Sequence, residues 1–271
     1  MADDPTPPEA ETTDCRLLVD PPLPGAWNMA VDEVLLDWSA ETGGCAWRFY
    51  QWEEPTLSLG YFQPEADRRS HHASASCPVV RRLTGGGAIL HDDELTYSVV
   101  VPAGHPLGAA RDRLYEAVHG SLIDVLSGQQ LAAALRGPGT PSSAADEPFL
   151  CFARRTPGDV LMAGVKIAGS AQRRRRGAVL QHGSVLLGLS EAAPEIHAPR
   201  AMREAALSPE QLAEAWLPAL ARRLGFEFRR QGLCEAERRR AEQLVRDRYA
   251  REDWTMGRRR AAQPADAPRP P

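Results

Sequence analysis

Hydrophobic and polar residues follow two different periods along this chain. Apolar side chains recur at helical spacing in the segment after Pro24-Gly25, which predicts an amphipathic helix over residues 26–40. The side chains that carry this pattern are Trp27, Val31, Val34, Leu35 and Trp38. The same kind of spacing predicts helices over 111–126, 209–224 and 235–250.

Short runs rich in β-branched and aromatic residues lie between these helical patterns. They predict strands over 46–50, 56–61, 79–83, 95–101, 159–162, 165–171 and 178–187. Interleaving of this kind is typical of an α/β (α+β) fold, here one domain over 14–255 with a central mixed β-sheet flanked by helices. The Pro-rich segments 1–13 and 256–271 are predicted to be disordered tails, and Gly137–Pro148 is predicted to be a loop.

Composition narrows the class of protein. The 271 residues carry a net charge of only −4, which gives no global field for binding nucleic acid or membranes. No apolar run approaches the roughly 20 residues of a membrane span, and the N-terminus lacks a signal peptide, so we expect a cytoplasmic protein. The five cysteines have no CxxC spacing, which argues against a disulfide framework or a zinc site.

One residue type is almost missing from the chain. Lys166 is the only lysine among 32 lysine and arginine residues. It is either a chance survivor of an arginine-rich composition or a position where a planar guanidinium cannot replace a compact ammonium. Its small, apolar, glycine-flanked surroundings favour the second interpretation. Asn28, the only asparagine, raises the same suspicion more weakly and shares a helix face with Asp32, where we expect both to support the sheet.

Three consecutive glycines, Gly85, Gly86 and Gly87, follow a predicted strand. They match neither a Walker loop nor a Rossmann loop, and a bare glycine triplet is more often a flexible turn. Glycine also allows a close approach of the backbone to a ligand. The flanking Arg82 and His91 favour a binding loop for an acyl chain or its carboxyl end.

Two further segments carry candidate chemistry. Cys151 lies between Leu150 and Phe152, where a cysteine is either a small core residue or a nucleophile that needs a nearby cation such as Lys166. His182 and Ser184 share one face of a predicted strand. His182 is a candidate general base or an ordinary structural histidine, and a serine hydrolase is disfavoured because no G-x-S-x-G segment exists.

The basic run Arg173–Arg176 is predicted to form a solvated hairpin tip, with docking of an acidic partner as the alternative. Nucleic acid is a less favoured partner because no aromatic residues are interleaved with the arginines.

Taken together, these segments resemble the lipoate–protein ligase/octanoyltransferase family over about residues 15–255. The resemblance rests on Gly25–Glu33, Ser58–Gln63, Arg81–Ala88, His91–Ser98, Lys166–Gln172 and Leu180–Ser184. It implies a fold related to biotin protein ligases and class II aminoacyl-tRNA synthetases. It also implies that Lys166 contacts the activated acyl carbonyl. The expected substrate-binding residues are Arg82, Gly85, Gly86, Gly87, His91, Gly169, Ser170, Ala171 and His182.

The resemblance covers two chemistries. Ligases of the family activate lipoate with ATP and magnesium, often with a C-terminal accessory domain, whereas octanoyltransferases take octanoate from acyl carrier protein through a cysteine thioester. The Cys151-Phe152 pair and the Glu94–Ser98 segment are similar to the cysteine octanoyltransferase subgroup, and only a Pro-rich tail follows residue 255. Arg154-Arg155 replaces a more apolar run, which affects the expected substrate preference.

The resulting prediction is an octanoyltransferase with Cys151 and Lys166 as catalytic residues and no cofactor or metal. It would take octanoyl from acyl carrier protein and pass it to a lipoyl-accepting protein such as glycine cleavage H protein, without nucleic acid or membrane partners. The alternatives are an ATP-dependent lipoate ligase, an amidotransferase that moves octanoyl or lipoyl groups between lipoyl proteins, and a catalytically silent acyl-binding scaffold.

Overall fold

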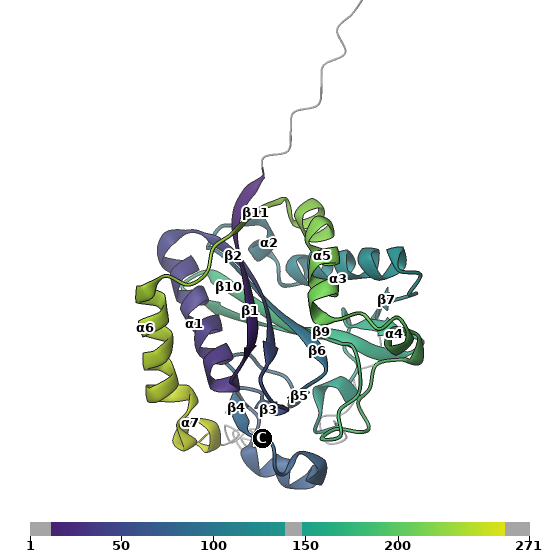
Figure 1. Cartoon of the computed structure of the whole chain (residues 1–271). Coiled ribbons are helices and arrows are strands. Elements are labelled where there is room, and N and C mark those ends of the chain that lie inside the picture. The colour runs from purple at the N-terminus through teal and green to yellow at the C-terminus, as the bar shows by residue number, and fades with distance from the viewer. Residues whose placement is uncertain (1–11, 139–147, 258–271) are drawn as a thin grey trace, which may run out of the picture.

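A computed structural model describes residues 12–138 and 148–257, and its centre is an eight-stranded sheet (Figure 1). The strand order is β11-β1-β2-β6-β10-β9-β8-β7. The strands are β1 (Thr13–Leu23), β2 (Cys45–Trp52), β6 (Glu94–Val101), β7 (Ala134–Leu135), β8 (Val160–Met162), β9 (Val165–Arg175), β10 (Ala178–Leu186) and β11 (Phe226–Arg230). β1 pairs in parallel with β11 and β2, and every other pairing in this sheet is antiparallel. The predicted mixed sheet is therefore confirmed.

Helices cover both faces of this sheet (Figure 1). α1 (Gly25–Thr42) and α6 (Glu235–Leu244) pack on one face, and α3 (Arg111–Gly128) and α5 (Pro209–Leu224) pack on the other. Local signals set the helix ends: α1 stops at Gly43, which adopts the left-handed conformation, and α5 starts at a capping box between Ser208 and Gln211. Each face of the sheet thus has its own apolar core, and the central strands are buried on both sides.

A second sheet of three strands carries the glycine triplet. Its order is β4-β3-β5, with bounds β4 (Val79–Arg81), β3 (Thr56–Leu59) and β5 (Ile89–His91). The fully buried Arg81 donates to the carbonyls of Gly60 and Gln63, both at 2.7 Å, and to that of Thr255 at 2.5 Å. Thr255 belongs to α7 (Glu252–Met256), so Arg81 ties the last described helix to the loop that follows β3.

The remaining described elements are short. They are η1 (Glu65–Ser70), η2 (His72–Ser74), α2 (Pro106–Ala109), η4 (Cys151–Ala153), α4 (Arg200–Glu204) and the π-helical turn η5 (Val245–Tyr249). None of the helices in the described ranges has the length and apolar character needed to cross a bilayer.

The structure corrects several sequence-based boundaries. The predicted helix over 235–250 is α6 followed by the π-helical turn, and strands β1 and β11 had no predicted counterpart. Thr13, assigned to a disordered tail, lies in β1 and pairs with Phe226, and Met256, assigned to the other tail, is the last residue of α7. A proline pair near the end of β1 and the long separation of its partner β11 hide these strands from local pattern analysis. The remaining tail and loop predictions, at 1–11, 139–147 and 258–271, lie outside the described residues.

Candidate active site

A cavity of about 1200 Å³ lies between the glycine triplet, η4 and strand β9. It is lined by every residue predicted for the site except His91: Arg82, Gly85, Gly86, Gly87, Cys151, Lys166, Gly169, Ser170, Ala171 and His182. Apolar side chains, including Ile89, Leu135 and Phe152, complete part of the wall. The cavity therefore combines space for an apolar chain with one thiol and one ammonium group.

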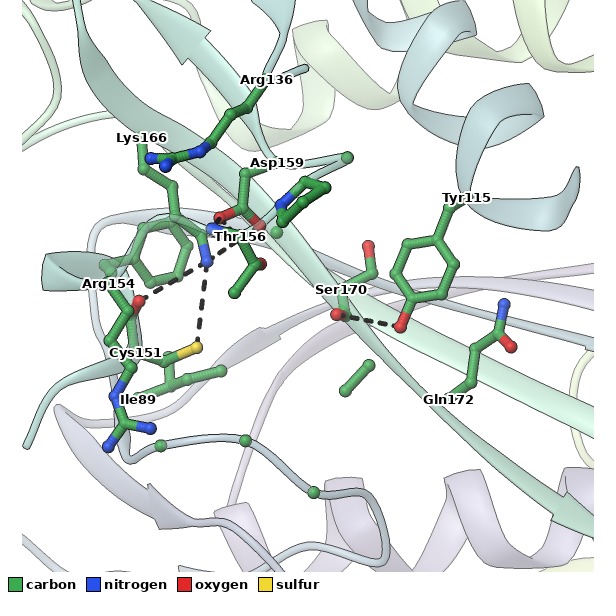
Figure 2. Close-up of a pocket in the computed structure, with 18 of the residues that line it drawn as sticks. Ile89, Tyr115, Arg136, Cys151, Arg154, Thr156, Asp159, Lys166, Ser170 and Gln172 are labelled. Atoms are coloured by element: carbon green, nitrogen blue, oxygen red, sulfur yellow. Dashed lines mark hydrogen bonds and ion pairs between the residues drawn. The ribbon is translucent and has the colours of Figure 1, made fainter. Parts of the chain in front are cut away.

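Cys151 and Lys166 face each other across this cavity (Figure 2). The Nζ atom of Lys166 lies 3.9 Å from the Sγ atom of Cys151 and 3.5 Å from its carbonyl oxygen. The backbone N–H of Cys151 donates to the carbonyl of Ala88 at 2.6 Å, which fixes η4 to the residue after the glycine triplet. An ammonium group at this distance can stabilise negative charge that develops on or beside the sulfur.

Asp159 forms an ion pair with Lys166, and sequence analysis did not identify this residue as part of the site. Its Oδ1 atom lies 3.0 Å from the Nζ atom of Lys166, and both side chains are buried. Its Oδ2 atom accepts from the backbone N–H of Thr156 at 2.7 Å and from the Thr156 hydroxyl at 3.1 Å. The carboxylate is thus oriented by its own turn, and it holds the lysine ammonium beside Cys151. An acidic residue seven positions before the only lysine was the one available signal.

Steric constraints explain why glycine occupies two of the motif positions. Gly86 adopts φ +93°, a conformation that side chains with a Cβ rarely adopt. A Cβ on Gly169 would lie 2.5 Å from the Cε atom of Lys166, far inside van der Waals contact. The guanidinium of Arg82 donates to the carbonyls of Gly85 at 2.8 Å and Gly87 at 2.7 Å. Arg82 therefore shapes the glycine loop, and its burial lowers its pKa to about 10.

His182 is held at both ring nitrogens. Its Nδ1 atom lies 2.9 Å from the Oδ2 atom of Asp32, and its Nε2 atom lies 2.6 Å from the Thr84 hydroxyl. Burial would raise the pKa of Asp32, but the hydrogen bond with His182 and the charge of Arg48 outweigh this and lower it. Asn28 accepts from the same Arg48 guanidinium at 2.8 Å, so the expected supporting role of Asn28 and Asp32 is confirmed. The geometry favours a structural histidine over a general base.

His91 and Ser184 lie in a separate small cavity. The ring of His91 stacks on Trp52 with centroids 3.9 Å apart, and its Nδ1 atom lies 2.5 Å from a carboxylate oxygen of Glu94. The Ser184 hydroxyl donates to the same carboxylate at 2.8 Å. Substrate binding by His91 stays a prediction, and the Ser184 hydroxyl is not directed at the Cys151 cavity.

The basic run is only partly a solvated hairpin tip, since Arg174 and Arg176 are exposed but Arg173 and Arg175 are half-buried. Strand β9 continues to Arg175, and only Arg176 and Gly177 form the turn. Arg175 forms ion pairs with Glu33 at 2.9 Å and with Asp37 at 2.8 Å, both on α1. The other members are also engaged: Arg174 with the Gly108 carbonyl, Arg176 with Glu41 and Arg173 with the Tyr61 ring. The run therefore ties the β9–β10 hairpin to its surroundings, which leaves less of it available for an acidic partner.

Comparison with known proteins shows which family the chain belongs to. Residues 24–212 match the model of the lipoyl protein ligase A/B catalytic domain. The chain belongs to this family. Among curated members, it is 32% identical to the octanoyltransferase LipM of Geobacillus kaustophilus, over 87% of this chain and 95% of that protein. It is also 32% identical to LipM of Brevibacillus brevis, over 90% and 99%.

Solved structures show the same family fold. The putative lipoate protein ligase Ta0514 of T. acidophilum superposes with a TM-score of 0.73 at 23% identity, covering 90% of this chain and 99% of that one. A lipoate-protein ligase A bound with ATP gives 0.71 at 23% identity, covering 91% and 100%. At this identity the likeness establishes the fold alone. In the described part of this chain, no three His, Cys, Asp or Glu side chains group in a way that could hold a metal ion.

Proposed function

We propose that the chain is an octanoyltransferase of lipoate biosynthesis that carries the octanoyl group on Cys151. Its donor is octanoyl-acyl carrier protein, and its acceptor is a lysine of a lipoyl domain or of a related protein such as glycine cleavage H protein. The observation that carries the proposal is the Lys166 ammonium 3.9 Å from the Cys151 sulfur in a partly apolar cavity. The curated LipM relatives, aligned over most of both chains, support the octanoyl specificity.

The first half-reaction forms the acyl-enzyme. The Cys151 thiolate attacks the carbonyl carbon of the donor thioester, so that a new C–S bond forms and the bond to the carrier thiol breaks. Lys166 stabilises the thiolate before the attack and the negative charge that develops on the carbonyl oxygen during it. The proton that left Cys151 ends on the departing carrier thiolate.

The second half-reaction releases the product. The neutral ε-amine of the acceptor lysine attacks the acyl-enzyme, the amide C–N bond forms, and the Cys151 C–S bond breaks. The amine proton ends on the released thiolate. An amide is more stable than a thioester, so the transfer is downhill and needs no ATP.

Intact-mass spectrometry after mixing with octanoyl-acyl carrier protein tests the proposal. We expect a mass gain of one octanoyl group that hydroxylamine removes and that Cys151→Ser lacks. Cys234→Ser is the matched control, because Cys234 is exposed and lies outside the cavity. Acylation that persists in Cys151→Ser, or that requires free octanoate and ATP, would contradict the proposal. Acylation from an octanoyl-lipoyl protein but not from the carrier protein would identify an amidotransferase.

A further inference from the structure

His119 lies on α3, behind the cavity wall, and only 1% of it is exposed. Its Nδ1 atom lies 2.6 Å from the carbonyl oxygen of Gly158, and its Nε2 atom lies 2.5 Å from the hydroxyl oxygen of Ser170. The ring therefore connects three separate elements: helix α3, the turn before β8, and strand β9.

The partners determine which ring nitrogen carries the proton. A carbonyl oxygen can only accept, so Nδ1–H donates to Gly158. Nε2 of the neutral ring then accepts from the Ser170 hydroxyl, whose oxygen also contacts the hydroxyl of Tyr97. Burial lowers the pKa of His119 to about 4, which keeps the ring neutral near pH 7.

The Gly158 carbonyl is attached directly to the nitrogen of Asp159, the residue that holds Lys166. We propose that His119 is a positioning residue, which acts through Gly158 to keep the Asp159 carboxylate on Lys166 and Lys166 beside Cys151. This inference rests on the roles that the proposed function gives to Cys151 and Lys166. His119 itself does not line the cavity.

Other contacts hold the same turn and make a mild substitution tolerable. The backbone N–H of Gly158 donates to the carbonyl of Arg136 at 2.9 Å, and that of Arg136 donates to the carbonyl of Asp159 at 2.7 Å. Loss of the His119 contact should therefore shift the turn without unfolding it.

Two amide substitutions separate the two contacts of the ring. In His119→Asn, the side-chain amide reaches roughly the position of Nδ1 and can donate to the Gly158 carbonyl. In His119→Gln, the longer side chain reaches roughly the position of Nε2, so it retains only the contact with Ser170. The readout is the rate of Cys151 alkylation by iodoacetamide at pH 7, measured by peptide mass in a Cys234→Ser background.

We expect His119→Gln to be alkylated about three- to tenfold more slowly at pH 7. His119→Asn should stay within about twofold of its parent. In an Asp159→Asn background, the difference between the two variants should disappear, because the carboxylate that they position is gone. Thermal melts of both variants check that they are folded.

Equal alkylation of the two variants, or a difference that persists without Asp159, would overturn the positioning role. Alkylation requires no acyl donor, so this result is independent of octanoyl transfer. A normal alkylation pattern with no acylation from octanoyl-carrier protein would refute the proposed function and leave His119 as assigned.

Discussion

The backbone of Gly169 lies directly against the aliphatic chain of Lys166. A Cβ at position 169 would lie 2.5 Å from the Cε atom of Lys166, 2.8 Å from its Nζ atom and 3.1 Å from the Oδ1 atom of Asp159. These atoms belong to the buried ion pair that holds the ammonium beside Cys151, so a side chain at position 169 would force the Lys166 ammonium to move. The spacing of the motif thus has a steric cause.

Gly169→Ala should displace the Lys166 ammonium and slow acylation of Cys151 by at least about tenfold, because small displacements of a catalytic group have large effects on rate. Single-turnover acylation from octanoyl-acyl carrier protein measures this. Gly128→Ala is the matched control, since a Cβ there meets nothing within 4 Å. Equal rates for the two variants would show that the contact between Gly169 and Lys166 is unimportant.

Lys166→Arg should leave the protein folded and reduce acylation by about a hundredfold or more. The guanidinium keeps the charge and an ion pair with Asp159, but its planar head cannot place a compact donor 3.9 Å from the Cys151 sulfur. The measurement is the acylation rate with a small octanoyl thioester, together with circular dichroism. Turnover close to that of the parent would show that the single lysine is a compositional accident.

His119 should also make stability depend on pH. Its pKa is about 4 in the folded state, below the ordinary histidine value of 6.5, because burial disfavours the charged ring. The unfolded chain therefore binds more protons between these values. The free energy of unfolding should fall as the pH drops from about 6.5 to 4, by up to about 3 kcal/mol.

Urea denaturation of the parent and of His119→Asn at pH 7 and pH 4.5 isolates this contribution, because Asn does not titrate. The loss of stability on acidification should be larger in the parent. His91, whose burial also lowers its pKa, is present in both proteins and cancels in the comparison. Parallel losses in the two proteins would contradict the prediction.

Arg175→Ser should lower stability more than it affects partner binding. The substitution removes the two ion pairs of Arg175 with α1, whose side chains are at most 25% exposed. The free energy of unfolding should therefore fall by about 1–2 kcal/mol. Arg176→Ser is the control: its pair with Glu41 is exposed and should contribute less than about 0.5 kcal/mol. An unchanged melting temperature with a raised KM for the carrier protein would restore the docking interpretation of the basic run.

Much of the site was predictable because its chemistry lies in short contiguous motifs. The Lys166 strand, the glycine triplet and the Cys151-Phe152 pair each have a local pattern, and the structure brings them to one cavity. Hydrophobic periodicity predicted the mixed sheet and the main helices, because this periodicity is also a local pattern in the sequence.

The features that escaped prediction depend on contacts between distant residues. Asp159 and His119 look ordinary in sequence, and only the fold shows that one holds Lys166 and the other holds the turn beside it. The run Arg173–Arg176 was predicted to be solvated because runs of charge usually are. Arg174 and Arg176 are exposed, but carboxylates on α1, more than 130 positions earlier, pair with Arg175 and Arg176. Strands β1 and β11 are parallel partners from opposite ends of the chain, and no local pattern specifies that pairing.

The scarcity of lysine has a consequence for the selectivity of the proposed reaction. An enzyme that delivers an activated acyl group to lysine amines is itself a potential acceptor, since thioesters also acylate exposed ε-amines nearby. This chain has a single ε-amine, which is 3% exposed and paired with a carboxylate. Its surface therefore offers no lysine to compete with the acceptor protein, and the arginines there stay protonated and are poor nucleophiles toward a thioester.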